Sequence, residues 1–175
     1  MITVIMRTVY AALDVETTGL HPTRGHRVIE IGVVLVRDGV IAGEFQSLIH
    51  CDRDMTKAAQ RIHGISAAML HGQPTPREVF EAFRNFIGNA LLVAHNAPFD
   101  RGFLQREFSL FGWRMANRMS CTLELSRQLL PQLPNHRLET VARHLFGELP
   151  EGNMPHRALS DARLTARIWA ALKER

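Results

Sequence analysis

Four carboxylates lie within or beside apolar stretches whose pattern predicts burial: Asp14, Glu16, Asp100 and Asp161. Burying an unpaired carboxylate is costly, and several buried together repel one another. A positive group must therefore balance them, and a cluster of oxygen ligands suits Mg²⁺ or Mn²⁺ better than Zn²⁺. Two divalent ions about 3.5–4 Å apart can clamp the attacking and leaving oxygens of a phosphodiester, which is the chemistry that these residues predict.

The predicted orientation of each acid supports this interpretation, although each has an ordinary alternative. Side chains alternate along a strand, so Asp14 and Glu16 point the same way while Val15 points into the core. The alternative for this segment is an acidic turn that ends a strand. Asp100 and Asp161 each share the apolar face of a predicted helix. For Asp100, an acid that stabilises the first turn of a helix is the alternative.

A histidine is expected beside these acids. His156 precedes Asp161 by five residues, a spacing that would point the two side chains apart within one helix. The sequence therefore predicts that His156 lies in the loop that enters the last helix, where it could face the same site. Imidazole exchanges protons near neutral pH, so this side chain is a candidate general base. A solvated loop histidine is the alternative.

Apolar periodicity predicts the elements that bring these side chains together. Strands are expected at residues 9–13, 28–36, 40–49 and 91–94, and helices at 75–87, 99–111, 122–130, 138–146 and 158–173. The pair Asp38-Gly39 predicts a tight hairpin turn between the second and third strands. Strands followed by helices and further strands predict an α/β fold with a mixed sheet flanked by helices.

Length and composition narrow the class of protein. The 175 residues predict a single domain, 1–175, with a sizeable core. No apolar run approaches the about 20 residues that span a bilayer, and Arg7 interrupts the apolar N-terminus, so we expect a cytoplasmic protein without a membrane partner. Cys51 and Cys121 form neither a disulfide framework nor a CxxC metal motif. The net charge of +4 favours a polyanionic partner held in a groove.

Three segments resemble the motifs of the DnaQ-like, or DEDDh, 3′–5′ exonucleases. LDVETTGL, AHNAPFD and HRALSDA are similar to the first, second and third motifs, and RIHGIS resembles a family segment near the substrate end. The resemblance implies an RNase H-like fold with a central five-stranded mixed sheet flanked by helices. It implies two Mg²⁺ (or Mn²⁺) ions bound by Asp14, Glu16, Asp100 and Asp161, and deprotonation of the attacking water by His156.

The resemblance also implies a substrate site and a substrate. The implied substrate contacts are Thr17, Leu20, His63, Asn96 and Phe99. For His63, an ordinary loop histidine is the alternative. The expected substrate is single-stranded DNA or a frayed 3′ end, because a paired terminus must first be unstacked. The expected product is a nucleoside 5′-monophosphate.

The favoured function is DNA proofreading or repair. The segments LDVETTGL and IHGI are similar to those of the proofreading ε subunits of bacterial DNA polymerase III. A polymerase partner is compatible with this resemblance, but the chain ends at Arg175 without a C-terminal tether, so we expect a free-standing repair nuclease. One alternative is a 3′–5′ exoribonuclease, and another is an inactive nucleic-acid-binding module. Inactive modules of this kind normally lack at least one acid. The resemblance does not indicate whether the protein is a monomer or a dimer.

Overall fold

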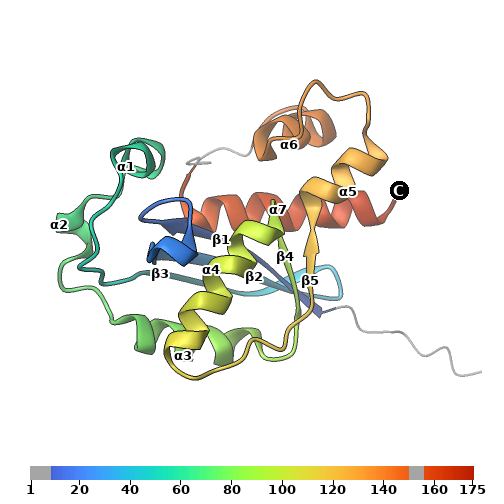
Figure 1. Ribbon diagram of the computed structural model, residues 1–175. Helices are drawn as coiled ribbons and strands as arrows, with labels where there is room; N and C mark the ends of the chain where they lie inside the picture. The colour runs from blue at the N-terminus through green and yellow to red at the C-terminus, as the bar shows by residue number, and fades with distance from the viewer. Residues whose placement is uncertain (1–8, 150–155) are drawn as a thin grey trace, which may run out of the picture.

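The centre of the molecule is a five-stranded sheet. The computed structural model describes residues 9–149 and 156–175 (Figure 1). The strands are β1 (Val9–Thr17), β2 (Val28–Arg37), β3 (Val40–Leu48), β4 (Leu91–Ala94) and β5 (Met119–Cys121), in the order β3-β2-β1-β4-β5. β2 pairs antiparallel with β1 and β3, whereas β4 pairs parallel with β1 and β5. The expected mixed five-stranded sheet is therefore confirmed.

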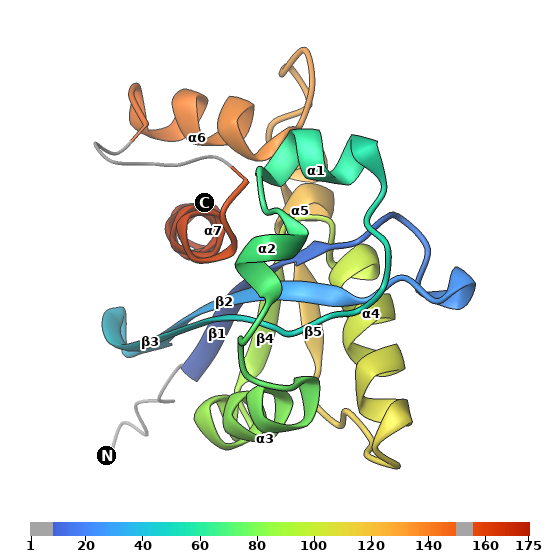
Figure 2. The same ribbon diagram turned by 90° about the vertical axis from the view of Figure 1, so that its left-hand side faces the viewer.

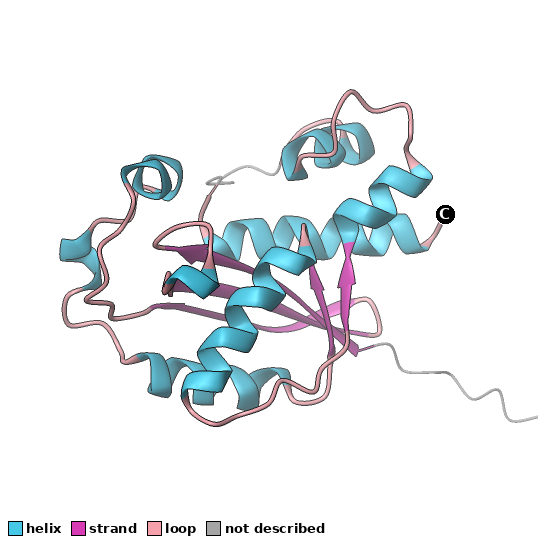
Figure 3. Cartoon of the chain, viewed as in Figure 1, coloured by secondary structure: helices cyan, strands magenta, loops and turns pink. Residues whose placement is uncertain are grey.

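Helices cover both faces of the sheet (Figure 3). They are η1 (Pro22–Arg24), α1 (Lys57–His63), α2 (Ala67–Leu70), α3 (Pro76–Ile87), α4 (Ala97–Leu110), α5 (Thr122–Leu129), α6 (Leu138–Phe146) and α7 (Ala158–Lys173). Figure 2 shows α7 and α3 on opposite sides of the sheet. Within the described residues, no helix has both the length and the apolar character needed to cross a membrane.

The alternation of side chains along β1 decides which face carries the acids. Leu13 and Val15 are buried in the core cluster that also contains residues of α3 and α4. Ala12 is buried in a second cluster, together with residues of α7. Asp14 and Glu16 follow Ala12 at two-residue spacing, so they lie on the α7 side of the sheet. The predicted common orientation of these two acids is therefore confirmed.

The strand that was predicted at residues 9–13 is longer in the structure, where it forms β1. The strand continues past Leu13 to Thr17, because Asp14, Val15 and Glu16 all pair with residues of β2. The two acids are therefore part of a paired strand and do not follow it. Pairing with a neighbouring strand can hold a polar residue in a sheet despite its low strand propensity.

Four short elements were missed, one of which is the three-residue 3₁₀ helix η1. β5 has three residues, too few for an alternating pattern to be visible. The seven residues of α1 and the four of α2 carry no apolar stripe of their own. A signal for α1 is nevertheless present, because Thr56 caps its first turn and Gly64 follows its last residue with a left-handed φ of 70°.

The predicted hairpin is confirmed. Asp38 and Gly39 adopt φ values of 51° and 80° between β2 and β3. Two consecutive left-handed residues give the tight turn whose twist matches the flanking strands. This hairpin joins β2 to β3. β2 also carries residues that contact the start of α7.

Candidate active site

Acidic side chains from β1, α4 and α7 meet at the edge of the sheet where β1 and β4 end. We call Asp14, Glu16, Asp100 and Asp161 the acid cluster. Burial is the largest cause that raises the pKa of Asp14, and the charges of Asp100, Glu16 and Asp161 raise it further. The backbone N–H of Val15 donates a hydrogen bond to the carboxylate of Asp100. The structure thus brings together all four acids that were selected from the sequence.

The acid cluster resists ionisation when no cation is present. Burial raises the pKa of Glu16 to about 8, and the charge of Asp161 adds to the effect. Burial also raises the pKa of Asp100 to about 8, although hydrogen bonds from backbone N–H groups oppose the shift. The pKa of Asp161 is raised to about 6, again mainly by burial. Several carboxylates that cannot share negative charge in one buried place need a cation.

The chemistry of the donor atoms fits a divalent ion. One ligand atom from each of Glu16, His156 and Asp161 lies within 4.8 Å of the other two, close enough to hold one ion. Oδ1 of Asp100 is buried and has no hydrogen-bond partner among the residues that the structure describes. A buried carboxylate oxygen without a partner is costly unless a ligand completes its coordination. Glu16, Asp161 and His156 are therefore spaced to hold one ion, and Asp100 Oδ1 beside them lacks a protein partner.

His156 lies at the rim of the acid cluster, in the loop before α7, as predicted. Its backbone adopts a left-handed φ of 60°, and its N–H donates a 3.1 Å hydrogen bond to Oδ2 of Asp161. This bond fixes the position of the loop relative to the first turn of α7. The imidazole is exposed, so it can exchange protons with solvent beside the acids.

An apolar hollow of about 440 Å³ adjoins the acid cluster. Four of the five predicted substrate residues line it: Thr17, Leu20, His63 and Phe99. Ile62 of α1 also lines it and was missed, because α1 itself was not predicted. Leu20 and Ile62 are 69% and 55% exposed, which is unusual for large apolar side chains. We call this feature the Leu20 hollow.

The remaining predicted substrate residue lies elsewhere. Asn96 is exposed, adopts a left-handed φ of 74° before α4, and does not line the Leu20 hollow. Its backbone carbonyl accepts a hydrogen bond from Phe99 N at 2.9 Å. The structure therefore shows Asn96 as a residue of the turn that presents Asp100.

His63 is a buried hydrogen-bond donor in the wall of the Leu20 hollow. Its Nδ1 accepts the N–H of Ile65 at 3.0 Å, so in the neutral ring the proton is on Nε2. Nε2 faces the backbone of Thr17 but completes no hydrogen bond with any described residue. Burial lowers the pKa of His63, which favours this neutral form. His63 therefore lines the Leu20 hollow with its ring, while its buried Nε2 is turned toward the backbone of Thr17.

Comparison with known proteins identifies the family. The sequence profile of the RNase_T family, described as exonucleases, matches residues 11–169. The chain belongs to this exonuclease family. The expected enzyme class is thereby confirmed, and the matched span includes every residue of the acid cluster and the Leu20 hollow.

Relatives of this exonuclease include replicative proteins. It is 40% identical over 167 residues to the PolC-type DNA polymerase III of Halalkalibacterium halodurans, covering 94% of the chain but 11% of that protein. It is 37% identical over 167 residues to the ε subunit of DNA polymerase III from Rickettsia conorii, covering 91% of the chain and 71% of that subunit. The resemblance to ε-type proofreading subunits is confirmed.

Solved structures agree with the fold. Exonuclease X in complex with 5′-overhanging duplex DNA superposes with a TM-score of 0.76 at 30% identity, covering 94% of this chain and 91% of that one. The nuclease domain of 3′hExo, a DEDDh family member bound to rAMP, gives a TM-score of 0.79 at 18% identity, covering 97% and 94%. The expected RNase H-like fold is confirmed.

A second hollow shares Asp161 with the acid cluster. It measures about 500 Å³ and is lined by His156 and Asp161 together with His95, Arg137 and Arg143. We call it the α6 hollow, because the two arginines lie at the start and in the last turn of that helix. The acid cluster thus lies between an apolar hollow and one that carries cationic side chains.

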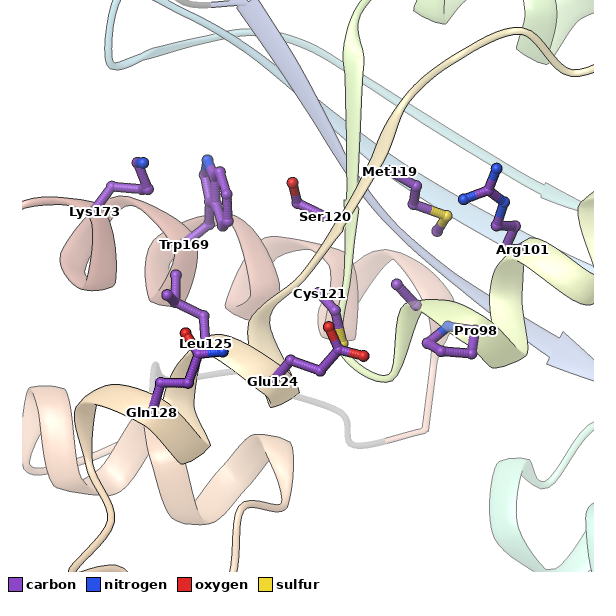
Figure 4. Close-up of a pocket in the computed structure, with 11 residues that line it drawn as sticks. Pro98, Arg101, Met119, Ser120, Cys121, Glu124, Leu125, Gln128, Trp169 and Lys173 are labelled. Atoms are coloured by element: carbon purple, nitrogen blue, oxygen red, sulfur yellow. The ribbon is translucent and has the colours of Figure 1, made fainter.

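Another hollow, of about 500 Å³, lies beside the edge strand β5 (Figure 4). Arg101, Ser120, Trp169 and Lys173 are among its lining residues. None of the predicted site residues lines it, and Glu124 is the only carboxylate among its described lining residues. These residues therefore lack the clustered carboxylates of the acid cluster.

Proposed function

We propose that this protein is a metal-dependent 3′–5′ exonuclease that removes nucleotides from the 3′ ends of DNA. The observation that carries the proposal is the meeting of four acids from three separate segments beside an exposed histidine and an apolar hollow. Family membership and relatives in DNA polymerase III support DNA as the substrate. Two Mg²⁺ or Mn²⁺ ions in the acid cluster would activate the attacking water and stabilise the departing 3′ oxygen.

Each residue of the site has a role in this proposal. The four acids of the acid cluster would hold the ions, with Asp14 close enough to feel the charges of the other three. His156 takes the proton of the attacking water, since its imidazole is exposed beside Glu16 and Asp161. The water then attacks the last phosphodiester, and a nucleoside 5′-monophosphate leaves.

The Leu20 hollow would bind the terminal nucleotide. Leu20 and Ile62 offer apolar surface to one side of a base, and Phe99 offers a ring. The ring of His63 lines the hollow and would contact the sugar of the bound nucleotide. A terminus must be unpaired to enter, so single strands and frayed ends are the proposed substrates.

The α6 hollow would bind the strand on the 5′ side of the cleaved bond. Arg137 and Arg143 line this hollow together with Glu139, which lies 3.3 Å from Arg143, and guanidinium groups bind phosphate oxygens well. Binding should therefore weaken as salt rises, because each phosphate contact releases counterions.

Digestion of end-labelled oligonucleotides tests the proposal. A 5′-labelled single strand of DNA should shorten stepwise from its 3′ end in Mg²⁺ or Mn²⁺, and should stay intact in EDTA. Duplex DNA with a flush end should react more slowly than the single strand. Intact circular single-stranded DNA is the control, because it has no 3′ end and must not be cut.

The same assay decides between the proposed function and its alternatives. An RNA strand of matched sequence that is degraded faster than the DNA strand would identify an exoribonuclease. Binding of either strand without release of mononucleotides, in both Mg²⁺ and Mn²⁺, would identify an inactive binding module. Shortening from the 5′ end would overturn the proposed polarity.

A further inference from the structure

The first turn of α7 is held on β2 by a buried ion pair. Arg157 Nη2 lies 2.7 Å from Oε1 of Glu30, and Arg157 Nε lies 3.2 Å from each oxygen of the same carboxylate. Glu30 is fully buried and also accepts the N–H of Ala158 at 3.1 Å and the side-chain amide of Gln46 at 2.9 Å. One carboxylate thus joins the loop before α7, the start of α7 and β3.

Close backbone packing reinforces this attachment. A Cβ atom at Gly32 would lie 2.1 Å from N and 2.4 Å from Cα of Leu159, so no side chain fits between β2 and α7. In the register of β1 and β2, Gly32 is opposite Asp14 and Glu30 is opposite Glu16. The start of α7 is therefore attached directly beside the two acids of β1.

The attached turn carries two groups of the proposed reaction. His156 immediately precedes Arg157, and Asp161 lies in the first turn of α7. The hydrogen bond from His156 N to Asp161 Oδ2 joins them to each other. Any movement of this turn along β2 would move both groups relative to the acids of β1.

We propose that Glu30 and Arg157 are positioning residues: their ion pair sets the place of His156 and Asp161 without holding the substrate. This inference rests on the proposed function. A misplacement of about 1 Å can cost about 10²-fold in rate, so loss of the pair should act on turnover. Among the described residues, the Leu20 hollow is lined by none from α7 and not by His156, so binding of the 3′ end should persist.

A matched ion pair on the same helix provides the control. Arg163 of α7 binds Glu44 of β3 through two nitrogens, at 2.7 and 2.6 Å. This pair also joins α7 to the sheet, but its side chains are partly exposed and it lies further along the helix. Variants of this pair test whether the loss of any ion pair of α7 lowers kcat in the same way.

The experiment compares conservative variants of the two pairs in the DNA digestion assay. Lysine keeps the charge of arginine but cannot reproduce its fork of two hydrogen bonds. We expect Arg157→Lys and Glu30→Gln to lower kcat by about 10- to 100-fold, with KM close to the wild-type value. Arg163→Lys and Glu44→Gln should keep the wild-type kcat. The double variant Glu30→Gln/Arg157→Lys should lose no more kcat than the worse single variant.

Several outcomes would overturn the inference. Wild-type kcat in Arg157→Lys would show that the fork does not position the reacting groups. An equal loss of kcat in Arg163→Lys would show that general attachment of α7 is responsible. A rise in KM at unchanged kcat would show that Arg157 binds the substrate directly.

Two further controls keep the result interpretable. Circular dichroism at the assay temperature checks that each variant is folded, and Arg157→Lys provides the test if Glu30→Gln does not fold, because it leaves a cation beside Glu30. A wild-type chain that degrades no nucleic acid would count against the proposed function. An active wild type whose Arg157→Lys variant is equally active would count against this inference alone.

Discussion

Two groups of buried carboxylates lie in one molecule and are balanced in different ways. Glu30 binds Arg157 and Glu107 binds Arg27, each through two guanidinium nitrogens. Each glutamate also accepts a backbone N–H at 3.1 Å. In the part of the chain that the structure describes, no acid of the acid cluster pairs with a lysine or arginine. Burial alone therefore does not separate the two groups, whereas the presence or absence of a paired guanidinium does.

The largest expected difference between the two groups is in activity. Asp14→Asn should lower kcat by at least about 10³-fold, because it removes a ligand from ions that contribute several kcal/mol to the transition state. Glu107→Gln should keep kcat, since Glu107 balances Arg27 away from the reacting groups. Turnover of labelled DNA and calorimetric titration with Mn²⁺ measure both effects. Unchanged Mn²⁺ affinity in Asp14→Asn would refute its role as a ligand.

The next test distinguishes the role of the acid cluster from the role of His156 beside it. His156→Ala should lower kcat by about 10²–10⁴-fold, the usual contribution of a general base. Mn²⁺ binding should largely survive, because the four carboxylates remain. His144→Ala is the control, since His144 is an exposed histidine of α6 outside the described hollows. Near-normal turnover in the His156 variant would count against its role as the base.

A further expected difference is in stability. Glu107→Gln should lower the free energy of unfolding by about 3–5 kcal/mol, because a buried pair that loses one partner leaves an uncompensated charge. Arg27 is 29% exposed, so water can reach it and the loss should be near the lower value. Urea unfolding followed by circular dichroism measures this effect. An unchanged unfolding midpoint would show that the pair does not stabilise the fold.

Replacing an acid of the acid cluster should change stability in the opposite direction: in metal-free buffer it should stabilise the fold. The pKa of Asp100 is raised to about 8 in the folded protein, above the value of about 3.9 for an unfolded chain. Below about pH 4 the carboxyl is protonated in both states and costs nothing. Between about pH 4 and 8 the unfolded chain releases this proton first, so stability falls as pH rises.

Asp100→Asn removes that cost and keeps an oxygen that can accept the N–H of Val15. In EDTA the variant should melt above the wild type, by about 2–4 °C for each kcal/mol gained. The difference should grow from pH 5 to pH 8. Excess Mg²⁺ should reverse it, because the ion binds the wild type more tightly. Scanning calorimetry measures the melting temperatures, and a variant that melts lower in EDTA at every pH would contradict the charge argument.

The sequence alone predicted most of what positions the acid cluster. Long periodic segments such as residues 158–173 gave correct helices, and the alternation around Val15 gave the correct face for its neighbouring acids. Strong periodicity works because one face must be buried whatever the tertiary contacts are. The elements that were missed, η1, α1, α2 and β5, are short, so tertiary contacts and caps stabilise them more than an apolar pattern does.

The sequence did not distinguish the two groups of buried acids. Glu30 and Glu107 also lie in apolar stretches, and the second shares the helix face of Asp100. Motif resemblance selected the four acids that the structure brings together, but no local pattern shows that Glu30 meets an arginine 127 residues away. Ile62 was missed for a similar reason, because its contact with the Leu20 hollow depends on where α1 packs.

The smallest expected effect concerns the third glutamate–arginine pair. Glu44 and Arg163 have the same two-nitrogen geometry as the buried pairs, but their side chains are 29% and 55% exposed. The hydrogen bond from Arg163 lowers the pKa of Glu44, so its contribution is present above about pH 4 and is lost as pH falls further. Water screens this interaction, and Arg163→Gln should therefore cost about 0–1 kcal/mol in urea unfolding, less at high salt.

If Arg163→Gln lowered the free energy of unfolding as much as Glu107→Gln does, this expectation would be contradicted. Hydrogen-bond geometry, and not burial, would then set the strength of these pairs. A small loss would show that the same fork is worth more where water is excluded. Burial then explains both groups of acids: it makes Arg27 and Arg157 necessary to Glu107 and Glu30, and it makes a bound ion necessary to the acid cluster.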